Sequence, residues 1–210
     1  MPWGVKSRVP ATIKTDIIAI SKNHPQNFVL EAIKSGVTKF GENRVNEANL
    51  KFNNLIKKFP NIELHLTGPL QSNKVKLAIS LFDVFHTLDR EKIAKEFFKN
   101  NQLLKGKKIF IQVNTGEEDS KSGVKPNHLK EFNNYCKNEL KLNITGLMCI
   151  PPIQDDPKLH FAMLQELAHK NNLEELSIGM SNDYLSALEF NPKYIRLGSI
   201  LFGKRNETQS

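Results

Sequence analysis

Lys22 stands at the end of a short apolar run that begins at Asp16, and Pro25 follows soon after it. The run predicts a buried strand, and Pro25 is typical of the first turn of a helix. The lysine amine is therefore expected at the junction of a strand and a helix. A partly desolvated amine has a lowered pKa and can attack a carbonyl group to form a Schiff base. The alternative is an ordinary solvated lysine, because the chain has 30 Lys and Arg residues.

Two segments near the end of the chain could bind a phosphate group. Ser181 precedes a predicted helix and could cap it, which would leave backbone N–H groups and the positive end of the helix dipole facing an anion. Gly198 and Ser199 follow the last predicted strand, and the lack of a Cβ atom at Gly198 would let main-chain N–H groups approach phosphate oxygens. A plain helix cap and a turn glycine are the alternatives, but the joint position favours phosphate.

Arg196 lies within an otherwise apolar predicted strand, two residues before Gly198. Side chains alternate along a strand, so both residues face the same side. A buried arginine needs a partner, which could be a ring nitrogen or carboxylate of a ligand, or a structural salt bridge with Asp183 or Glu42. An amine, a phosphate cradle and a guanidinium together fit pyridoxal 5′-phosphate (PLP). A phosphorylated sugar handled by a Schiff-base aldolase would fit the first two.

The elements that must position these residues alternate between strands and helices. Apolar runs predict strands over residues 16–21, 38–41, 62–67, 84–88, 108–114, 143–148, 175–179 and 194–198. Amphipathic stretches predict helices over residues 25–35, 44–59, 70–82, 90–104, 126–140, 157–171 and 182–190. Strand followed by helix, repeated with short loops, favours a parallel sheet. Eight strands would close a single α/β (β/α)8 TIM barrel, with its chemistry at the carboxyl ends of the strands.

One outer helix is missing from this pattern. It should follow residues 194–198 or precede residues 16–21, where residues 1–13 are a poor candidate because they contain Pro2 and Pro10. An open doubly wound sheet is the competing topology. No GxGxxG or GxxxxGK[ST] loop follows any predicted strand, which argues against a nucleotide-binding version of that sheet.

The composition favours a single globular domain over residues 1–210. The formal charge of +8 comes mostly from dispersed lysines, which predicts a solvated face and no specific nucleic-acid site. Cys136 and Cys149 are too far apart for a zinc ribbon or a redox motif, so we expect two small buried residues and no metal site. There is no apolar span long enough for a membrane helix and no secretory signal, so we expect a cytoplasmic protein without membrane contact.

Longer segments carry a family resemblance. They include AISK ending at Lys22, FGENRVNE from Phe40, HLTGPLQSNKVK from His65, QVNTGEEDSKSG from Gln112, LSIGMSNDY from Leu176 and IRLGSILFG from Ile195. Through these segments the chain closely resembles the pyridoxal phosphate homeostasis protein family, whose members bind PLP and are related to the N-terminal domain of alanine racemase.

The resemblance implies a fold-type III PLP-binding barrel. It also implies that Lys22 holds PLP as an aldimine and that Arg196 faces the pyridine nitrogen. The other cofactor-binding residues that it implies are Ser181, Gly198 and Ser199 at the phosphate and Asn43 and Ser177 near the ring. His65 and His86, near the ends of two predicted strands, are expected to be satisfied core histidines.

The expected function is intracellular PLP homeostasis, by buffering or delivery of the cofactor, without substantial catalysis and without catalytic residues. The related racemases take a second acid/base group from a tyrosine of another domain, whereas Tyr135, Tyr184 and Tyr194 are expected to be packing or strand residues here. An arginine at the pyridine nitrogen would also keep that nitrogen unprotonated and weaken the ring as an electron sink.

Two alternatives remain for the function. One is an amino-acid racemase of low activity, and the other is a nucleic-acid or protein interaction module that uses the positive surface. A carrier would have PLP and PLP-dependent apo-enzymes as its partners, and the lack of a second domain favours a monomer.

Overall fold

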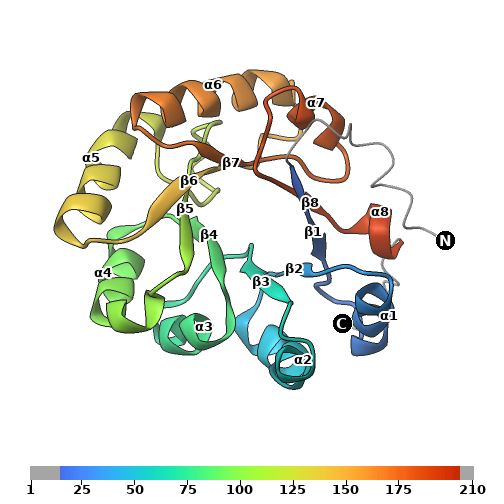
Figure 1. Cartoon of the computed structure of the whole chain (residues 1–210). Helices are drawn as coiled ribbons and strands as arrows, with labels where there is room; N and C mark the ends of the chain where they lie inside the picture. Colours follow the sequence, from blue (N-terminus) through green and yellow to red (C-terminus); the bar gives the residue numbers. More distant parts are fainter. Residues whose placement is uncertain (1–14, 204–210) are drawn as a thin grey trace.

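The computed structural model describes residues 15–203, and within them eight parallel strands close into a barrel (Figure 1). The strands follow one another around the barrel in chain order, and β8 pairs with β1 to close it. They are β1 (Asp16–Ile20), β2 (Lys39–Glu42), β3 (Glu63–Leu66), β4 (Val84–Leu88), β5 (Lys108–Gln112), β6 (Ile144–Met148), β7 (Glu175–Ser177) and β8 (Tyr194–Leu197). The predicted TIM barrel is confirmed, and the open sheet is excluded because no strand edge is left unpaired within these residues.

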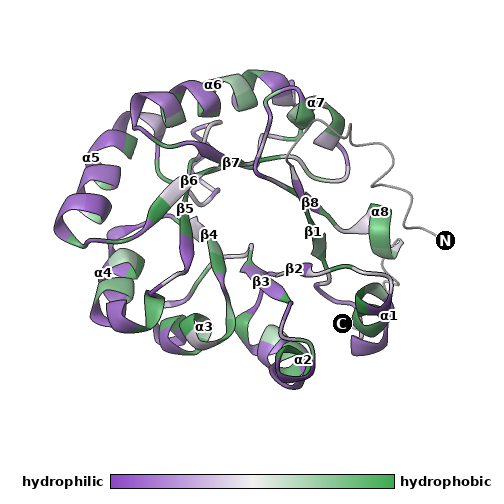
Figure 2. Cartoon of the chain, viewed as in Figure 1, coloured by the Kyte–Doolittle hydropathy of each residue, from purple (hydrophilic) through white to green (hydrophobic). Residues whose placement is uncertain are grey.

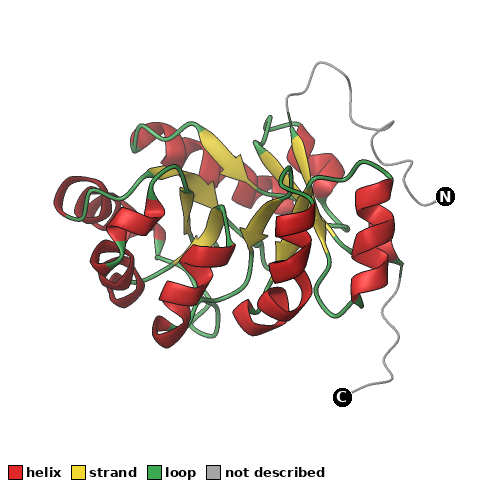
Figure 3. Ribbon diagram, turned by 60° about the horizontal axis from the view of Figure 1, so that its bottom comes forward, coloured by secondary structure: helices red, strands yellow, loops and turns green. Residues whose placement is uncertain are grey.

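Helices form an outer layer around the strands, as Figure 3 shows from the side. They are α1 (Gln26–Lys34), α2 (Val45–Lys58), α3 (Val75–Leu81), α4 (Glu91–Lys99), α5 (Leu129–Asn134), α6 (Pro157–Lys170), α7 (Tyr184–Leu188) and α8 (Ser199–Phe202). Shorter 3-10 turns cover Ser72–Lys74, Asn101–Leu104 and Pro126–His128, and a π-helix, Tyr135–Glu139, continues α5.

Each helix packs an apolar side against the sheet because its apolar residues recur at helical spacing. In α4, Ile93 and Phe97 are buried, whereas Lys95 and Lys99 have side chains more than half exposed. The hydropathy colours of Figure 2 show both kinds of residue on the helices around the barrel. Burial of each large apolar side chain contributes roughly 1.5–3 kcal/mol, so this outer core stabilises the barrel.

The inside of the barrel is filled with side chains. An inner apolar group consists of Ile18, Ile20, Val84, Phe110, Met148 and Tyr194. The rings of His65 and His86 lie 5.0 and 5.5 Å from that of Tyr194, centroid to centroid. At the amino ends of the strands, Lys108 and Glu175 form an ion pair of 2.7 Å. A ligand must therefore bind at one end of this packed barrel.

The outer helix that the sequence pattern lacked is α8, which follows β8. It has only four residues and ends at Gly203, whose φ of 82° glycine adopts without strain. In Figure 1 it lies beside α1, and the rings of Phe202 and His24 are 5.0 Å apart. This is one of the two predicted places for the helix; the other, residues 1–13, lies outside the described residues.

Most predicted boundaries are too wide by one or two residues, and three helices differ more: those predicted over residues 70–82, 90–104 and 126–140 each include a 3-10 turn outside the α-helix. The helix predicted over residues 126–140 divides into a 3-10 turn, α5 and the π-helix. The helix predicted from residue 182 begins at Tyr184 instead, because residues 180–183 first close a turn in which the Asp183 N–H donates to the Met180 carbonyl over 3.1 Å.

Candidate functional site

The residues singled out from the sequence gather at the carboxyl ends of the strands. Lys22 follows β1, Asn43 follows β2, and Gly198 follows β8. β1 pairs with both β2 and β8, so these three residues leave adjacent strands at the same end of the barrel. Ser177 is the last residue of β7, which pairs with β8. We call this end, where barrel enzymes carry their chemistry, the mouth.

Lys22 occupies a tight turn. The His24 N–H donates to the Ser21 carbonyl over 3.1 Å, which closes the turn around Lys22 and Asn23. Asn23 has a φ of 60°, a left-handed conformation that asparagine adopts more readily than most residues. Ser21 is fully buried and Lys22 is half-buried, so the lysine stands at the edge of the core.

Arg196 is buried inside the mouth with 5% of its surface exposed. Its Nη1 donates to the Ser177 carbonyl over 2.7 Å and to the Ser177 hydroxyl over 2.8 Å, and its Nη2 donates to the Cys149 carbonyl over 3.0 Å. Within residues 15–203 it forms no salt bridge; Glu42 pairs with Lys51 instead. The structural salt bridge considered for Arg196 is therefore excluded.

The guanidinium of Arg196 still has capacity for a ligand. It carries more N–H donors than these three bonds use, and a buried charged donor without a partner costs free energy. Burial lowers the pKa of Arg196, but an arginine remains protonated at neutral pH. A neutral ring nitrogen, which can accept a hydrogen bond, is a suitable partner for such a donor.

A chain of buried hydrogen bonds runs from Ser177 across the barrel interior. Ser177 Oγ is 2.9 Å from His86 Nδ1, His86 Nε2 is 3.0 Å from His65 Nδ1, and His65 Nε2 is 2.9 Å from Glu63 Oε1. The Glu63 carboxylate can only accept, so His65 Nε2 carries the proton. If both imidazoles are neutral, His65 Nδ1 accepts a hydrogen bond from His86 Nε2, and His86 Nδ1 accepts one from the Ser177 hydroxyl.

The pKa shifts in this chain agree with neutral histidines. Burial lowers the pKa of His65 and lowers that of His86 well below its usual value. The hydrogen bond from His65 lowers the pKa of Glu63 to about 2. His65 and His86 are thus satisfied core histidines, as predicted, and they hold the hydroxyl that accepts from Arg196.

Of the two predicted phosphate-binding segments, residues 198–199 lie at the start of a helix as expected, whereas Ser181 does not. Gly198 precedes α8, and the N–H groups of Leu201 and Phe202 turn back to its carbonyl. Ser199 is exposed at the first position of α8. Ser181, however, does not cap α7: Asp183 stands before that helix, and its carboxylate accepts the Met180 N–H. The predicted cap is wrong because the β7–α7 connection has an additional turn, in which Ser181 is half-buried.

Gly198 has space around it for a side-chain atom. A Cβ atom at this position would lie 3.5 Å from the Ile20 carbonyl oxygen, which is an ordinary contact. Packing does not require a glycine there, so any need for one must come from a ligand.

Asn43 is held by the next strand connection. Its Oδ1 accepts a hydrogen bond from the Thr67 hydroxyl over 3.0 Å. The Cα atom of Gly68 packs so closely that an added Cβ would lie 2.3 Å from the Asn43 carbonyl oxygen. Thr67 and Gly68 therefore fix Asn43, although neither was predicted as a cofactor-binding residue.

The pairing of Lys51 with Glu42 was not predicted, although the sequence holds a signal for it. In α2 the buried residues Ala48, Phe52 and Leu55 form the apolar stripe, and Lys51 falls within it. A lysine on a buried face requires an acidic partner. Glu42, the last residue of β2, supplies it at 2.7 Å.

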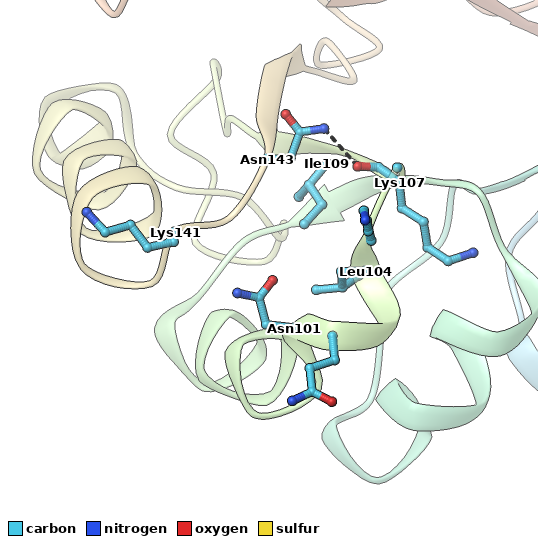
Figure 4. A pocket seen from close by; sticks show the side chains of 9 residues that line it. Asn101, Leu104, Lys107, Ile109, Lys141 and Asn143 are labelled. Carbon is cyan, nitrogen blue, oxygen red and sulfur yellow. Dashed lines mark hydrogen bonds between the residues drawn. The ribbon is translucent and has the colours of Figure 1, made fainter.

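A pocket of about 450 Å³ opens at the opposite end of the barrel, before β5 and β6 (Figure 4). Lys107 and Lys141 line it, but their side chains point away from one another, and Lys107 Nζ donates to the Phe82 carbonyl over 2.6 Å. This pocket is therefore neither the mouth nor a convergent anion site.

The cysteines, possible metal ligands and helix lengths can also be compared with the sequence. Cys136 and Cys149 are buried free cysteines, as predicted. Among residues 15–203, no three His, Cys, Asp or Glu side chains are grouped as a metal site would need. Over the same range, every helix is too short or too polar to cross a membrane.

Comparison with known proteins identifies relatives over nearly the whole chain. The family model described as alanine racemase, N-terminal domain, matches residues 5–206. The pyridoxal phosphate homeostasis protein of Pasteurella multocida is 36% identical over 203 residues, which cover 90% of this chain and 86% of the relative. The protein of the same name from Vibrio alginolyticus is 38% identical over 212 residues, which cover 95% of this chain and 89% of the relative.

Solved structures give the same result. PipY of Synechococcus elongatus without PLP has a TM-score of 0.84 at 33% identity, covering 95% of this chain and 97% of PipY. PipY with PLP bound has a TM-score of 0.83 at 31% identity, with the same coverage. The alanine racemase of Acinetobacter baumannii, 15% identical, has a TM-score of 0.75 over 96% of this chain and 60% of the racemase, and shares the fold. The resemblance inferred from the sequence is confirmed, and the chain belongs to the alanine racemase N-terminal domain family.

Proposed function

We propose that this protein binds PLP covalently through Lys22 and acts in PLP homeostasis. The observation that carries the proposal is the pairing of β1 with β8, in which Ala19 lies opposite Leu197. This register brings the turn of Lys22 beside the strand of buried Arg196. The names of the homeostasis relatives and the PLP bound to PipY support the same ligand.

The residues of the mouth fit the parts of PLP. Lys22 supplies a primary amine whose nitrogen can bond to the aldehyde carbon, with the carbonyl oxygen leaving as water. Arg196 has spare N–H donors for a ring nitrogen. The main-chain N–H groups of Gly198 and Ser199, which follow β8, would bind the phosphate, together with Ser181, which follows the adjacent strand β7. Asn43 and Ser177 would lie near the ring.

The same residues support binding without substantial catalysis. Bound PLP supplies an electron sink for carbanion chemistry, and the sink is strong only when the ring nitrogen is protonated. Arg196 stays protonated and donates, so it would keep that nitrogen unprotonated. Its hydrogen bonds to Ser177 and Cys149 fix it in this role.

The tyrosines offer no second acid/base group at the mouth. Tyr194 is buried inside the barrel, with its ring 5.0 Å from that of His65. Tyr184 belongs to the apolar core between strands and helices, and Tyr135 packs against that core. A racemase of low activity is the alternative. Racemisation would abolish the optical rotation of an L-alanine solution incubated with the PLP-loaded protein. An optical rotation that stays constant with time would argue against racemase activity.

We further propose that the protein works as a monomer in the cytoplasm and passes PLP to apo-enzymes. The two buried thiols, unpaired by a disulfide, suit a reducing compartment. Delivery predicts that the PLP-loaded protein restores activity to a PLP-dependent apo-enzyme faster than its spontaneous release of PLP allows. Restoration no faster than release would support buffering alone.

A direct test compares two lysine variants. Wild-type protein titrated with PLP should develop the visible absorbance band of a lysine–PLP adduct, and Lys22→Ala should not. Lys76→Ala, at an exposed position of α3, is the control and should keep the band. A full band in Lys22→Ala would refute the assignment of Lys22.

A further inference from the structure

A buried charged cluster lies behind the turn that carries Lys22. Glu42 is fully buried, and Lys51 has 8% of its surface exposed. Lys51 Nζ donates to three oxygens: Glu42 Oε1 at 2.7 Å, the Ser21 carbonyl at 2.7 Å and Glu47 Oε1 at 3.2 Å. One acceptor for each N–H satisfies the ammonium group completely.

This cluster contacts the backbone on both sides of Lys22. The Ser21 carbonyl, which closes the turn, accepts from Lys51, and the Ser21 hydroxyl donates to Glu42 Oε1 over 2.7 Å. The N–H of Asn23 donates to Glu47 Oε1 over 2.7 Å. The residues before and after Lys22 are thus attached to one ammonium group and its two carboxylates.

The cluster is also anchored to the helix that follows the turn. The side chain of Gln26, the first residue of α1, donates to the Lys51 carbonyl over 2.9 Å. The turn, α1 and α2 therefore share one set of hydrogen bonds. Asn23, whose φ is 60°, lies within this set of hydrogen bonds.

Burial of a lysine and a glutamate is costly, and an apolar pair of similar size is often equally stable in a core. The cluster therefore calls for a role that apolar side chains could not fill. The role available here is to fix the Ser21 carbonyl and the Asn23 N–H, because only charged or polar groups can bind both.

We propose that Lys51, with Glu42 and Glu47, is a positioning residue that holds the Lys22 turn so that the Lys22 amine meets the aldehyde of PLP. This inference rests on the proposed function, and it assigns no contact between Lys51 and the cofactor. A small displacement of a reacting group is enough to weaken a covalent encounter by an order of magnitude or more.

The test uses two vitamers that differ at the reacting carbon. PLP has the aldehyde, whereas pyridoxamine 5′-phosphate has the same ring and phosphate without it. Lys51→Met should weaken PLP binding by about tenfold and slow adduct formation to a similar extent. Its affinity for pyridoxamine 5′-phosphate should stay within about twofold of wild type, because the phosphate and ring contacts remain.

Lys51→Met leaves Glu42 buried without its cation, so the variant will be less stable. Glu42→Gln/Lys51→Met removes both charges and should regain thermal stability without regaining PLP affinity; it carries the test if the single variant does not fold. Lys107→Met is the matched control. Lys107 also donates to a backbone carbonyl, that of Phe82 at 2.6 Å, but at the far end of the barrel, and its loss should leave both affinities unchanged.

The outcomes separate the two proposals. If wild-type protein forms no adduct with PLP, the proposed function fails. If wild type forms the adduct and the double variant binds PLP as tightly as wild type, only the positioning role of Lys51 fails. Equal losses for PLP and pyridoxamine 5′-phosphate would also overturn it, because they would show a general loss of the site.

Discussion

Arg196 donates two hydrogen bonds to Ser177 from one nitrogen, to the carbonyl over 2.7 Å and to the hydroxyl over 2.8 Å. The hydroxyl of Ser177 in turn lies 2.9 Å from His86 Nδ1. The orientation of the guanidinium at the mouth is thus set by a neutral histidine in the middle of the barrel. This relationship explains how a short strand such as β7 can hold a buried cation in place.

Ser177→Ala should lower the free energy of unfolding by roughly 1.5–3 kcal/mol, because it removes the oxygen that accepts from a charged donor and leaves His86 Nδ1 without its partner. Urea unfolding would measure the change. Ser80→Ala is the control, since Ser80 is exposed and its hydroxyl donates only to the nearby Leu77 carbonyl over 2.8 Å. Equal stability of the two variants would show that the buried hydroxyl contributes nothing.

The neutral state of His86 predicts a specific pH dependence. Burial lowers its pKa well below 6.5, so the unfolded chain takes up a proton below about pH 6.5 that the folded protein does not. Stability is therefore lost as the pH falls, by about 1.4 kcal/mol per pH unit for one such histidine.

His86→Gln should remove that loss. The stability advantage of wild type over the variant should shrink by about 1.4 kcal/mol per pH unit between pH 6.5 and 5, as measured by denaturant unfolding. Glu63 does not affect this measurement. Its pKa is lowered from 4.5 to about 2, so its contribution to the pH dependence of stability falls below about pH 4.5. A constant difference across this range would mean that His86 is protonated in the folded protein.

Substitution by alanine should have opposite effects on folding at Gly146 and at Gly198. A Cβ atom at Gly146 would lie 1.9 Å from the Glu175 carbonyl oxygen in the neighbouring strand, so Gly146→Ala should prevent stable folding. Gly198→Ala meets only ordinary contacts and should unfold at the wild-type temperature. Thermal melting followed by circular dichroism distinguishes them.

If the main chain at Gly198 approaches a phosphate, Gly198→Ala should nevertheless bind PLP more weakly. Pyridoxal, which lacks the phosphate, should bind the variant and wild type equally. An unchanged affinity of Gly198→Ala for PLP would remove Gly198 from the site.

Thr67→Val tests the support of Asn43. Valine keeps the shape of threonine but loses the hydroxyl that donates to Asn43 Oδ1 over 3.0 Å. One neutral hydrogen bond is worth about 1 kcal/mol, so PLP affinity should fall about fivefold if Asn43 contacts the ring. Fluorescence titration would measure it, and an unchanged dissociation constant would exclude that contact.

The sequence was sufficient for the barrel and for the end of it at which the candidate residues Lys22 and Gly198 lie. Apolar runs such as residues 84–88 are the strands themselves, and parallel strands bring all their carboxyl ends together. Lys22 and Arg196 therefore had to come from adjacent strands once β8 closed the barrel against β1. The residue pattern could not show how loops turn. The extra turn before Tyr184, which displaces Ser181 from its predicted cap, depends on the Asp183 carboxylate binding the Met180 N–H.

Contacts between elements distant in sequence were also beyond prediction from the pattern. His65 and His86 are satisfied by groups on β3, β4 and β7, and no local spacing indicates that Ser177 would be the partner of His86. Lys51 was predicted only as one of many dispersed lysines, although its place on the apolar stripe of α2 distinguishes it.

The central claim is that the Lys22 amine is the covalent attachment point of PLP. Borohydride reduction of the PLP-loaded protein, followed by digestion and peptide mass spectrometry, tests it most directly. The account predicts one added pyridoxyl phosphate group per chain, on the peptide that contains Lys22. A label spread over exposed lysines, with the Lys22 peptide unmodified, would contradict it.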